Sequence, residues 1–108
     1  MKLVIAIVQD NDVNLLMDDL VENEFSVTKL STTGGFLREG NTTLLLGVEE
    51  DRLQTAIDLI EKNGKKRKAT TTFLNSSVQG SMFNSLPVEI EVGGATVFVL
   101  EIDQFYKL

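Results

Sequence analysis

The amino-acid sequence predicts an α+β domain in which apolar strands alternate with two amphipathic helices. Three observations lead to this fold class: a continuous β-branched run near the start, two segments with apolar residues at helical spacing, and several strand-like segments around them. A chain of 108 residues has the length of one domain. We therefore expect residues 1–108 to form a single domain.

The first two elements are a strand and a helix. Leu3–Val8 is continuously apolar and bounded by polar residues, which is typical of a strand buried on both faces. Asp10, Asn11 and Asp12 follow as candidate helix N-caps. The stripe at helical spacing that predicts the first helix consists of Val13, Leu16, Met17, Leu20 and Val21.

A hairpin comes next. Phe25–Leu30 alternates as a strand does, and Thr42–Gly47 forms a second, more apolar strand. Between them lie the glycine pair Gly34-Gly35 and the turn signal Glu39-Gly40-Asn41. The second helix follows, with acidic residues at its start and Asn63-Gly64 at its end. Its apolar stripe consists of Leu53, Ala56, Ile57 and Ile60.

A long loop separates this helix from the last strands. Gly64–Leu86 is rich in Thr, Ser, Asn and Gly, and we expect one long loop, residues 64–86, with ends that can extend. Val88–Val92 then alternates as a strand with one solvated face. Gly93-Gly94 predicts a tight hairpin turn into a final strand, Ala95–Ile102.

Without the loop and the accessory strand 88–92, the order is the ferredoxin-like β-α-β-β-α-β, an antiparallel sheet with two helices on one face. Leu3–Val8, Leu44–Leu46 and Thr96–Leu100 are nevertheless apolar at consecutive positions. Two helices cover only one face, so the other face needs a cover too. The simplest cover is another copy of the chain, and we expect a homo-oligomer.

Composition excludes several classes of function. Ten Lys and Arg against sixteen Asp and Glu give a net charge of −6, which argues against binding a nucleic-acid polymer. The chain has no Cys and no His, which excludes disulfides, Cys or His metal sites and His-based triads. The longest apolar run is far shorter than the roughly 20 residues that span a bilayer. We expect a cytoplasmic protein without a metal, a cofactor or a membrane partner.

The stretch from Thr28 to Gly47 carries the most chemistry. Gly34 and Gly35 allow positive φ and a close approach of the backbone to a ligand. Side chains that can hydrogen-bond phosphate oxygens or a base edge are Thr28, Thr32, Thr33 and Asn41. The same residues also fit a strand bulge and a hairpin turn with no ligand.

Several blocks of the sequence resemble one family. These blocks are Ala6–Asp10, Val27–Leu30, Thr32–Leu37, Gly40–Thr43, Gly47-Val48 and Pro87–Leu100. In their order and spacing they resemble the PII-like cyclic-di-AMP receptor family, a group of signal-transduction proteins. The resemblance covers the chain except for roughly residues 69–86.

The resemblance implies a homotrimer of PII-like, ferredoxin-like subunits that binds one cyclic di-AMP in each cleft between neighbours. It implies no catalysis, and signalling to a downstream protein through loop rearrangement. It implies that Thr28, Gly35 and Phe36, with Gly34 beside them, lie along the phosphate–ribose ring. Asn41 and Gly47 would meet one adenine, and Leu37 and Phe98 would contact the bases.

Two positions beside that site depart from the family pattern. The family tends to have Asn and Arg where this chain has Glu24 and Ser26, and both differences weaken binding of an anionic ligand. The 73–86 segment also lacks the family's usual Pro-Met-Gly-Gly stretch. Two alternatives therefore stay open: a diverged PII-like regulator of another adenine nucleotide, and a small ferredoxin-like enzyme that uses carboxylates.

Charged clusters elsewhere have two readings each. Lys65–Lys68 is either a docking patch for an acidic partner or a phosphate, or a solvated segment. Asp18-Asp19 and Glu49–Asp51 are either metal ligands or structural charges on a helix face and at a helix start.

Overall fold

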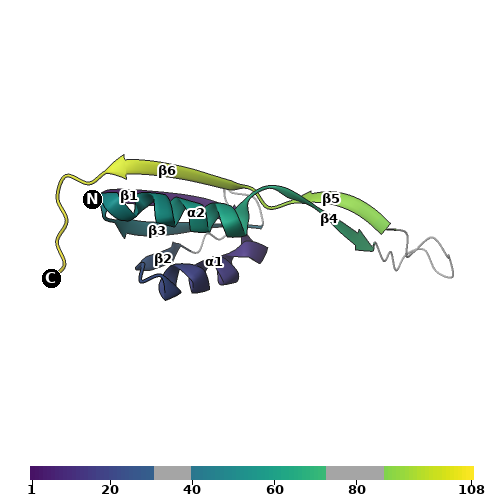
Figure 1. Ribbon diagram of the computed structural model, residues 1–108, viewed down its shortest axis with the longest axis horizontal. Helices are drawn as coiled ribbons and strands as arrows, with labels where there is room; N and C mark the ends of the chain where they lie inside the picture. The colour runs from purple at the N-terminus through teal and green to yellow at the C-terminus, as the bar shows by residue number, and fades with distance from the viewer. Residues whose placement is uncertain (31–39, 73–86) are drawn as a thin grey trace.

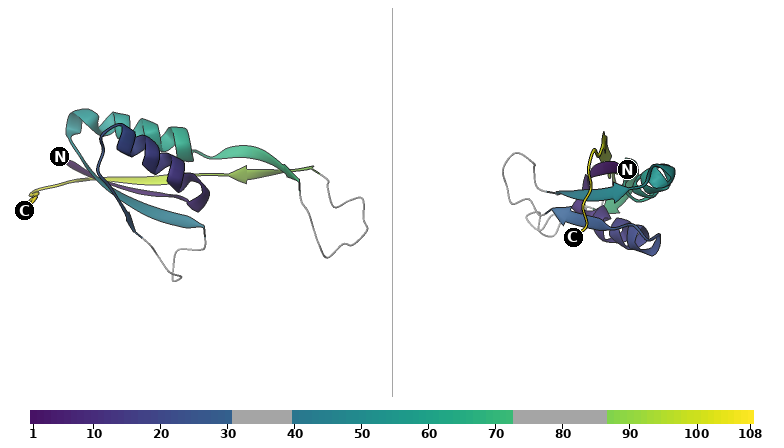
Figure 2. Two further views of the ribbon diagram at one scale, coloured as in Figure 1. Left: turned by 90° about the horizontal axis from the view of Figure 1, so that it is seen from below. Right: turned by 90° about the vertical axis from the view of Figure 1, so that its left-hand side faces the viewer.

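The computed structural model describes residues 1–30, 40–72 and 87–108 (Figure 1). The elements are β1 (Lys2–Gln9), α1 (Asp10–Glu22), β2 (Val27–Leu30), β3 (Asn41–Val48), the 3-10 helix η1 (Glu50–Arg52), α2 (Leu53–Gly64), β4 (Arg67–Thr72), β5 (Pro87–Val92) and β6 (Ala95–Glu101). One antiparallel sheet has the spatial order β2-β3-β1-β6, and β4 pairs with β5 apart from it. Both helices lie on one face of the main sheet (Figure 2). The predicted ferredoxin-like α+β class is confirmed.

β1 is an interior strand, as its continuous apolar run predicts. It pairs antiparallel with β3 on one side and with β6 on the other, so that Ile5 lies opposite both Leu45 and Phe98. Successive side chains of a strand point to opposite faces, and β1 therefore supplies apolar side chains to both faces of the sheet.

The two faces differ in how they are covered. The face under the helices, which we call the closed face, holds the core. Its fully buried strand residues are Val4, Ala6, Val8, Leu44 and Leu46. On the opposite face, which we call the open face, Leu3, Ile5 and Ile7 are only half-buried, and Phe98 is 52% exposed.

Helix α1 begins at Asp10, and its predicted N-caps do not cap it. Gln9 holds the N-cap position, and no side-chain hydrogen bond caps the helix. Asp10 instead accepts a hydrogen bond from the Thr42 hydroxyl, and Asp12 accepts one from Arg67. The capping prediction is wrong because these two carboxylates bind other elements, although their charge still suits a helix N-terminus.

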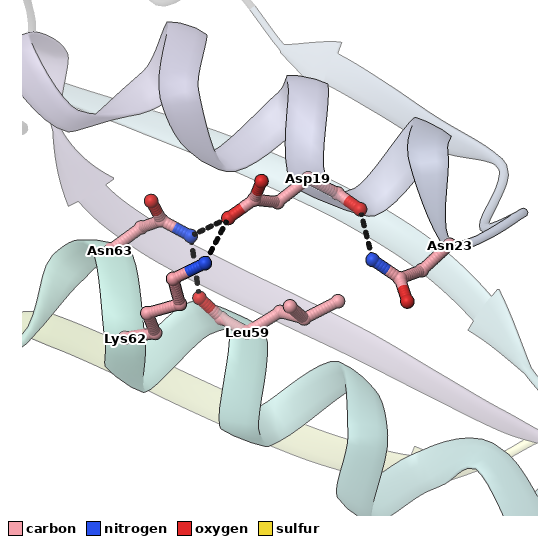
Figure 3. A network of polar contacts seen from close by, with 5 residues as sticks. All are labelled: Asp19, Asn23, Leu59, Lys62 and Asn63. Atoms are coloured by element: carbon pink, nitrogen blue, oxygen red, sulfur yellow. Dashed lines mark hydrogen bonds and ion pairs between the residues drawn. The ribbon is translucent and has the colours of Figure 1, made fainter.

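A polar network joins the two helices (Figure 3). Oδ2 of Asp19 on α1 accepts hydrogen bonds from Asn63, at 2.9 Å, and Lys62, at 3.2 Å, both on α2. These donors, Asn63 first, hold the pKa of Asp19 below its usual value of 3.8. Asp19 therefore has a structural role, which fits the structural reading of the Asp18-Asp19 pair.

The segment after α2 differs in part from the predicted loop. Residues 67–72 form strand β4, which pairs antiparallel with β5, so the first end of the 64–86 segment is extended and hydrogen-bonded. We call this two-stranded ribbon the arm; it extends beyond the main sheet (Figure 1). A run of threonines formed the strand because threonine is β-branched and Val88 and Ile90 offered a matching partner strand.

The predicted hairpin turn at Gly93-Gly94 is wrong. β5 pairs with β4 and β6 pairs with β1, so these glycines lead from the arm into the sheet. Both have positive φ, 83° and 109°. A Cβ at Gly93 would overlap the Lys65 carbonyl oxygen and the Arg67 guanidinium, so this close crossing needs glycine.

Two lysines of the basic segment Lys65–Lys68 form ion pairs with glutamates of β5. Lys66 pairs with Glu91 at 2.9 Å, and Lys68 pairs with Glu89 at 3.4 Å, on one face of the arm. This pairing favours the structural reading of Lys65–Lys68. None of the helices in the described parts of the chain is long and apolar enough to cross a membrane.

Candidate functional site

One row of side chains runs across the open face from edge to edge. The antiparallel register aligns Thr28, Leu45, Ile5 and Phe98, one from each strand of the sheet. Thr28 and Phe98 are both exposed and lie on opposite edges. Three strand spacings separate them, roughly 14 Å. Within one subunit these two predicted site residues do not come together.

A second group gathers at the corner where β2 meets β3. Gly47 is exposed and lies diagonally across from Thr28, at roughly 7–8 Å by strand geometry. Continuing the same register by one residue brings Ser26 opposite Gly47. Thr28, Gly47 and Ser26 thus share one corner of the open face.

The turn into β2 has an unusual backbone at Glu24. Its φ is +66°, in the left-handed region that is rare for residues other than glycine, asparagine and aspartate. The next residue, Phe25, is buried, and Arg52 of η1 lies over its ring with 4.0 Å to the centroid. Arg52 also donates a hydrogen bond to the Asn23 carbonyl oxygen. Arg52 therefore holds the turn that presents Glu24, whose side chain is exposed.

Asn41 lies at the far end of β3, in a polar pocket. The pocket has a volume of about 340 Å³ and is lined by Gln9, Asp10, Asn11, Gly40 and Asn41. Asn41 is half-buried and lies opposite Gln9 in the β1–β3 register. The amide of Asp10 donates to the Gly40 carbonyl at 2.6 Å, so two of the lining residues are hydrogen-bonded to each other.

Asn41 and Gly47 are six residues apart on one strand, roughly 20 Å. One adenine is too small to contact both from a single subunit. The structure thus brings Thr28, Ser26 and Gly47 together and leaves Asn41 and Phe98 apart from them. Gly34, Gly35, Phe36 and Leu37 lie outside the described residues.

Sequence reasoning gave no role to Gln9 and Arg52. Gln9 lines the pocket beside Asn41, and Arg52 holds the turn at Glu24. The block Ala6–Asp10 already contained Gln9, and a polar residue directly after a buried strand is a usable signal. Arg52 left no such signal, because its contact with Phe25 joins segments far apart in the sequence.

A second pocket, of about 510 Å³, lies between α2 and the start of β6. It is the larger and more apolar of the two, and its lining includes Ile57, Ile60 and Val97 but none of the predicted site residues. We take the polar pocket as the candidate site because it holds Asn41, an amide that can recognise a base edge. In residues 1–30, 40–72 and 87–108, no three acidic side chains gather where a metal would bind.

The fold and this arrangement define a small α+β domain of the ferredoxin-like class, with polar ligand-type residues at the edges of an open sheet face. The chain belongs to the cyclic-di-AMP receptor family, which it matches over residues 1–108. It is also similar to a crystal structure of a functionally unknown protein from Pediococcus pentosaceus, with 43% identity and a TM-score of 0.80. That match covers 99% of this chain and 96% of the other.

Proposed function

We propose that this protein is a cytoplasmic receptor that binds cyclic di-AMP without catalysis, in clefts between the subunits of a homotrimer. Family membership supports the ligand. The distance between Thr28 and Phe98 supports a site between subunits. These residues lie about 14 Å apart on opposite edges of the sheet, so both can contact one ligand if one subunit supplies β2 and its neighbour supplies β6. The distance between Asn41 and Gly47 on β3 supports the same arrangement.

The open face supports self-association. Phe98 and Leu100 on β6 are 52% and 46% exposed, and the apolar residues of β1 beside them are only half-buried. A patch of this kind is unusual on a soluble single subunit and typical of a contact between copies. Assembly around the open face would bury it and bring the edges β2 and β6 of neighbouring subunits toward each other.

The residues suit a cyclic dinucleotide chemically. The Asn41 amide both donates and accepts, so it can pair with the edge of an adenine. The Thr28 hydroxyl can donate to a phosphate oxygen, and the Phe98 ring offers a face for stacking. Gly47 lets the ligand approach the backbone. In this proposal Gly34, Gly35, Phe36 and Leu37 complete the contacts to the phosphate–ribose ring and the second base.

The corner residues favour a second candidate ligand. Ser26 places a short hydroxyl next to Thr28 and Gly47, and Glu24 lies two residues earlier, in the turn into β2. A ligand with less phosphate charge at that corner would suffer less repulsion. The second candidate function is therefore regulation by another adenine nucleotide, one that places its phosphate away from this corner.

Calorimetry with cyclic di-AMP, cyclic di-GMP, ATP and AMP tests the ligand, and light scattering tests the trimer. We expect the strongest heat with cyclic di-AMP and the same dinucleotide recovered unchanged afterwards. Asn41→Ala should weaken binding by roughly 1–3 kcal/mol, because a base contact is lost and its partner is left unpaired. Asn14→Ala, on the exposed face of α1, is the matched control. Equal heats for both dinucleotides, or a stable monomer, would overturn the proposal.

A downstream protein would read the occupied state. The arm extends away from the sheet and the helices, at the end of the molecule opposite the C-terminus (Figures 1 and 2). We propose that the partner contacts the region of the arm.

A further inference from the structure

The base of the arm is held to the rest of the chain by a small set of polar contacts, which we call the arm junction. It consists of Gln9, Asp12, Gly64, Arg67 and the Gly93-Gly94 pair. The Arg67 guanidinium donates to Asp12 Oδ1 at 2.8 Å and to the Lys65 carbonyl at 3.0 Å. In the described parts of the chain, hydrogen bonds between the arm strands and the elements beneath them are confined to this junction.

The end of β5, the second strand of the arm, is hydrogen-bonded to β1 and to α2. The Gly93 amide donates to Oε1 of Gln9 at 2.8 Å, and the Gly94 amide donates to the Gly64 carbonyl at 2.6 Å. Gly64 is buried against Val8, so the end of α2, the end of β1 and both arm strands meet at one point. The base of the arm is therefore held by a few contacts, which reach Gln9 of β1, Asp12 of α1 and Gly64 of α2.

The Asp12–Arg67 ion pair uses only one oxygen of the Asp12 carboxylate. The Asp12 side chain is 7% exposed, and its Oδ2 atom has no hydrogen-bond partner among the described residues. Arg67 is 43% exposed and divides its donors between Asp12 and the Lys65 carbonyl. A buried carboxylate with one unpaired oxygen is satisfied only in part, so this contact holds the arm less firmly than a two-oxygen pair would.

Gln9 belongs to both the junction and the candidate ligand pocket. Its backbone lies opposite Asn41, it lines the pocket with Asn41, and its side chain accepts from Gly93. A ligand that fills this pocket restricts the Gln9 side chain and so strengthens its hold on Gly93. We propose that Gln9 is the positioning residue through which ligand occupancy tightens the arm, with the Asp12–Arg67 pair as the second fastening. The coupling rests on the proposed ligand site, and the fastening does not.

Hydrogen exchange of the arm amides in the ligand-free protein tests the fastening. Arg67→Gln should speed exchange in β4 and β5 by about tenfold relative to β1, which corresponds to one lost hydrogen bond to a charged group. Because Arg67→Gln leaves a buried carboxylate unpaired, Asp12→Asn provides a second, neutral test and should give the same direction. Lys29→Gln removes an exposed positive charge on β2, away from the arm, and should leave arm exchange unchanged. Equal exchange in all three variants would overturn the fastening.

The same measurement with saturating cyclic di-AMP tests the coupling. Each variant's saturation is first established by calorimetry. In the original sequence the ligand should slow arm exchange several-fold. Gln9→Ala should abolish this slowing, and Gln9→Glu, which keeps an acceptor for the Gly93 amide, should retain part of it. Binding without any slowing, or slowing that survives in Gln9→Ala, would overturn the coupling and leave the proposed function standing. Absence of binding to the original sequence would overturn the proposed function and the coupling, while the ligand-free exchange still decides the fastening.

Discussion

The closed and open faces of one sheet are made from the same strands and similar residues, yet they have different surroundings. On β1, Val4, Ala6 and Val8 are fully buried under the helices, whereas the alternating Leu3, Ile5 and Ile7 are half-buried. Folding of a single chain explains the apolar residues of the closed face only. The apolar side chains of the open face stay partly exposed in a single chain, and the proposed trimer would cover them after the chain has folded.

The largest expected contrast is in stability, between neighbouring leucines of β3. Leu44→Ala on the closed face should lower the free energy of unfolding by roughly 2–5 kcal/mol, because it leaves a cavity in the core. Leu45→Ala on the open face should cost only about 1 kcal/mol at low protein concentration. Urea denaturation at two concentrations measures both, and the cost at Leu45 should grow with concentration as assembly buries it. Equal costs in the dilute protein would mean that the two faces are equally buried in one chain.

The next contrast is in assembly, between neighbouring residues of β6. Leu100 on the open face and Val99 on the other face are 46% and 42% exposed, so they are a matched pair. Leu100→Glu should weaken the trimer by about 2 kcal/mol or more per subunit, because it buries a charge in an apolar contact. Val99→Glu should leave the trimer intact. Light scattering measures the mass, with circular dichroism as the check on folding; dissociation by both variants would place the contact elsewhere.

A smaller effect is expected at the edge of the open face, at Glu24. If the corner contacts phosphate, a carboxylate roughly 6–8 Å away opposes binding by about 0.5–1 kcal/mol at low salt. Glu24→Asn should therefore tighten cyclic di-AMP binding a few-fold, and the gain should shrink as salt rises. It should also raise the melting temperature slightly, because asparagine tolerates the left-handed backbone at this position better than glutamate does.

Calorimetry at two salt concentrations measures the change at Glu24, and Glu22→Gln on the exposed side of α1 is the control for net charge. Adding Ser26→Arg should increase the gain by supplying a phosphate donor. An unchanged affinity at low salt would show that Glu24 points away from the ligand.

The smallest effect concerns the helices over the closed face. The pKa of Asp19 is held below 3.8 in the folded protein, chiefly by Asn63 and then Lys62. Because the pKa of Asp19 is lower in the folded than in the unfolded protein, its ionised carboxylate stabilises the fold at pH values above the unfolded pKa. This stabilisation is lost as the pH falls below about 4 toward the pKa of the folded protein. Asp19→Asn should therefore lower the melting temperature at neutral pH and flatten its fall in acid. Asp18→Asn, on the outer side of α1, is the control; an unchanged acid slope in Asp19→Asn would exclude this contact as a source of acid sensitivity.

The spacing of apolar residues predicted those helices and strands whose apolar residues are buried in the folded protein. The apolar run of β1 and the stripes of α1 and α2 gave the correct elements because burial imposes those patterns directly. The pairing at Gly93-Gly94 was predicted wrongly, because two strands joined by glycines look the same in sequence whether they pair with each other or with different strands. β5 pairs with β4 instead of β6, and the threonines of β4 give no apolar pattern that would have predicted this strand.

The ligand contacts of the candidate site stay a prediction, and the arrangement of its residues could not be predicted from the sequence. Residue chemistry singled out Thr28 and Asn41, and the family resemblance added Gly47 and Phe98. The strand register then placed these residues at different edges and ends of the sheet. Register depends on pairing between distant segments, so no single motif contains it. The contact between Gln9 and Gly93 could not be predicted for the same reason, because Gly93 lies 84 residues further along the chain.

The arm also bears on how this chain can be altered by evolution or by design. Thr72 and Pro87 are paired across its far end, and the arm strands share no register with the main sheet. Residues can therefore be added or removed between them at the modest entropic expense of a longer or shorter connection, while the β2-β3-β1-β6 sheet keeps its alignment. If the proposed partner contacts the arm, a change confined to this segment would alter the partner and leave the β2-β3-β1-β6 sheet and the candidate ligand pocket unchanged.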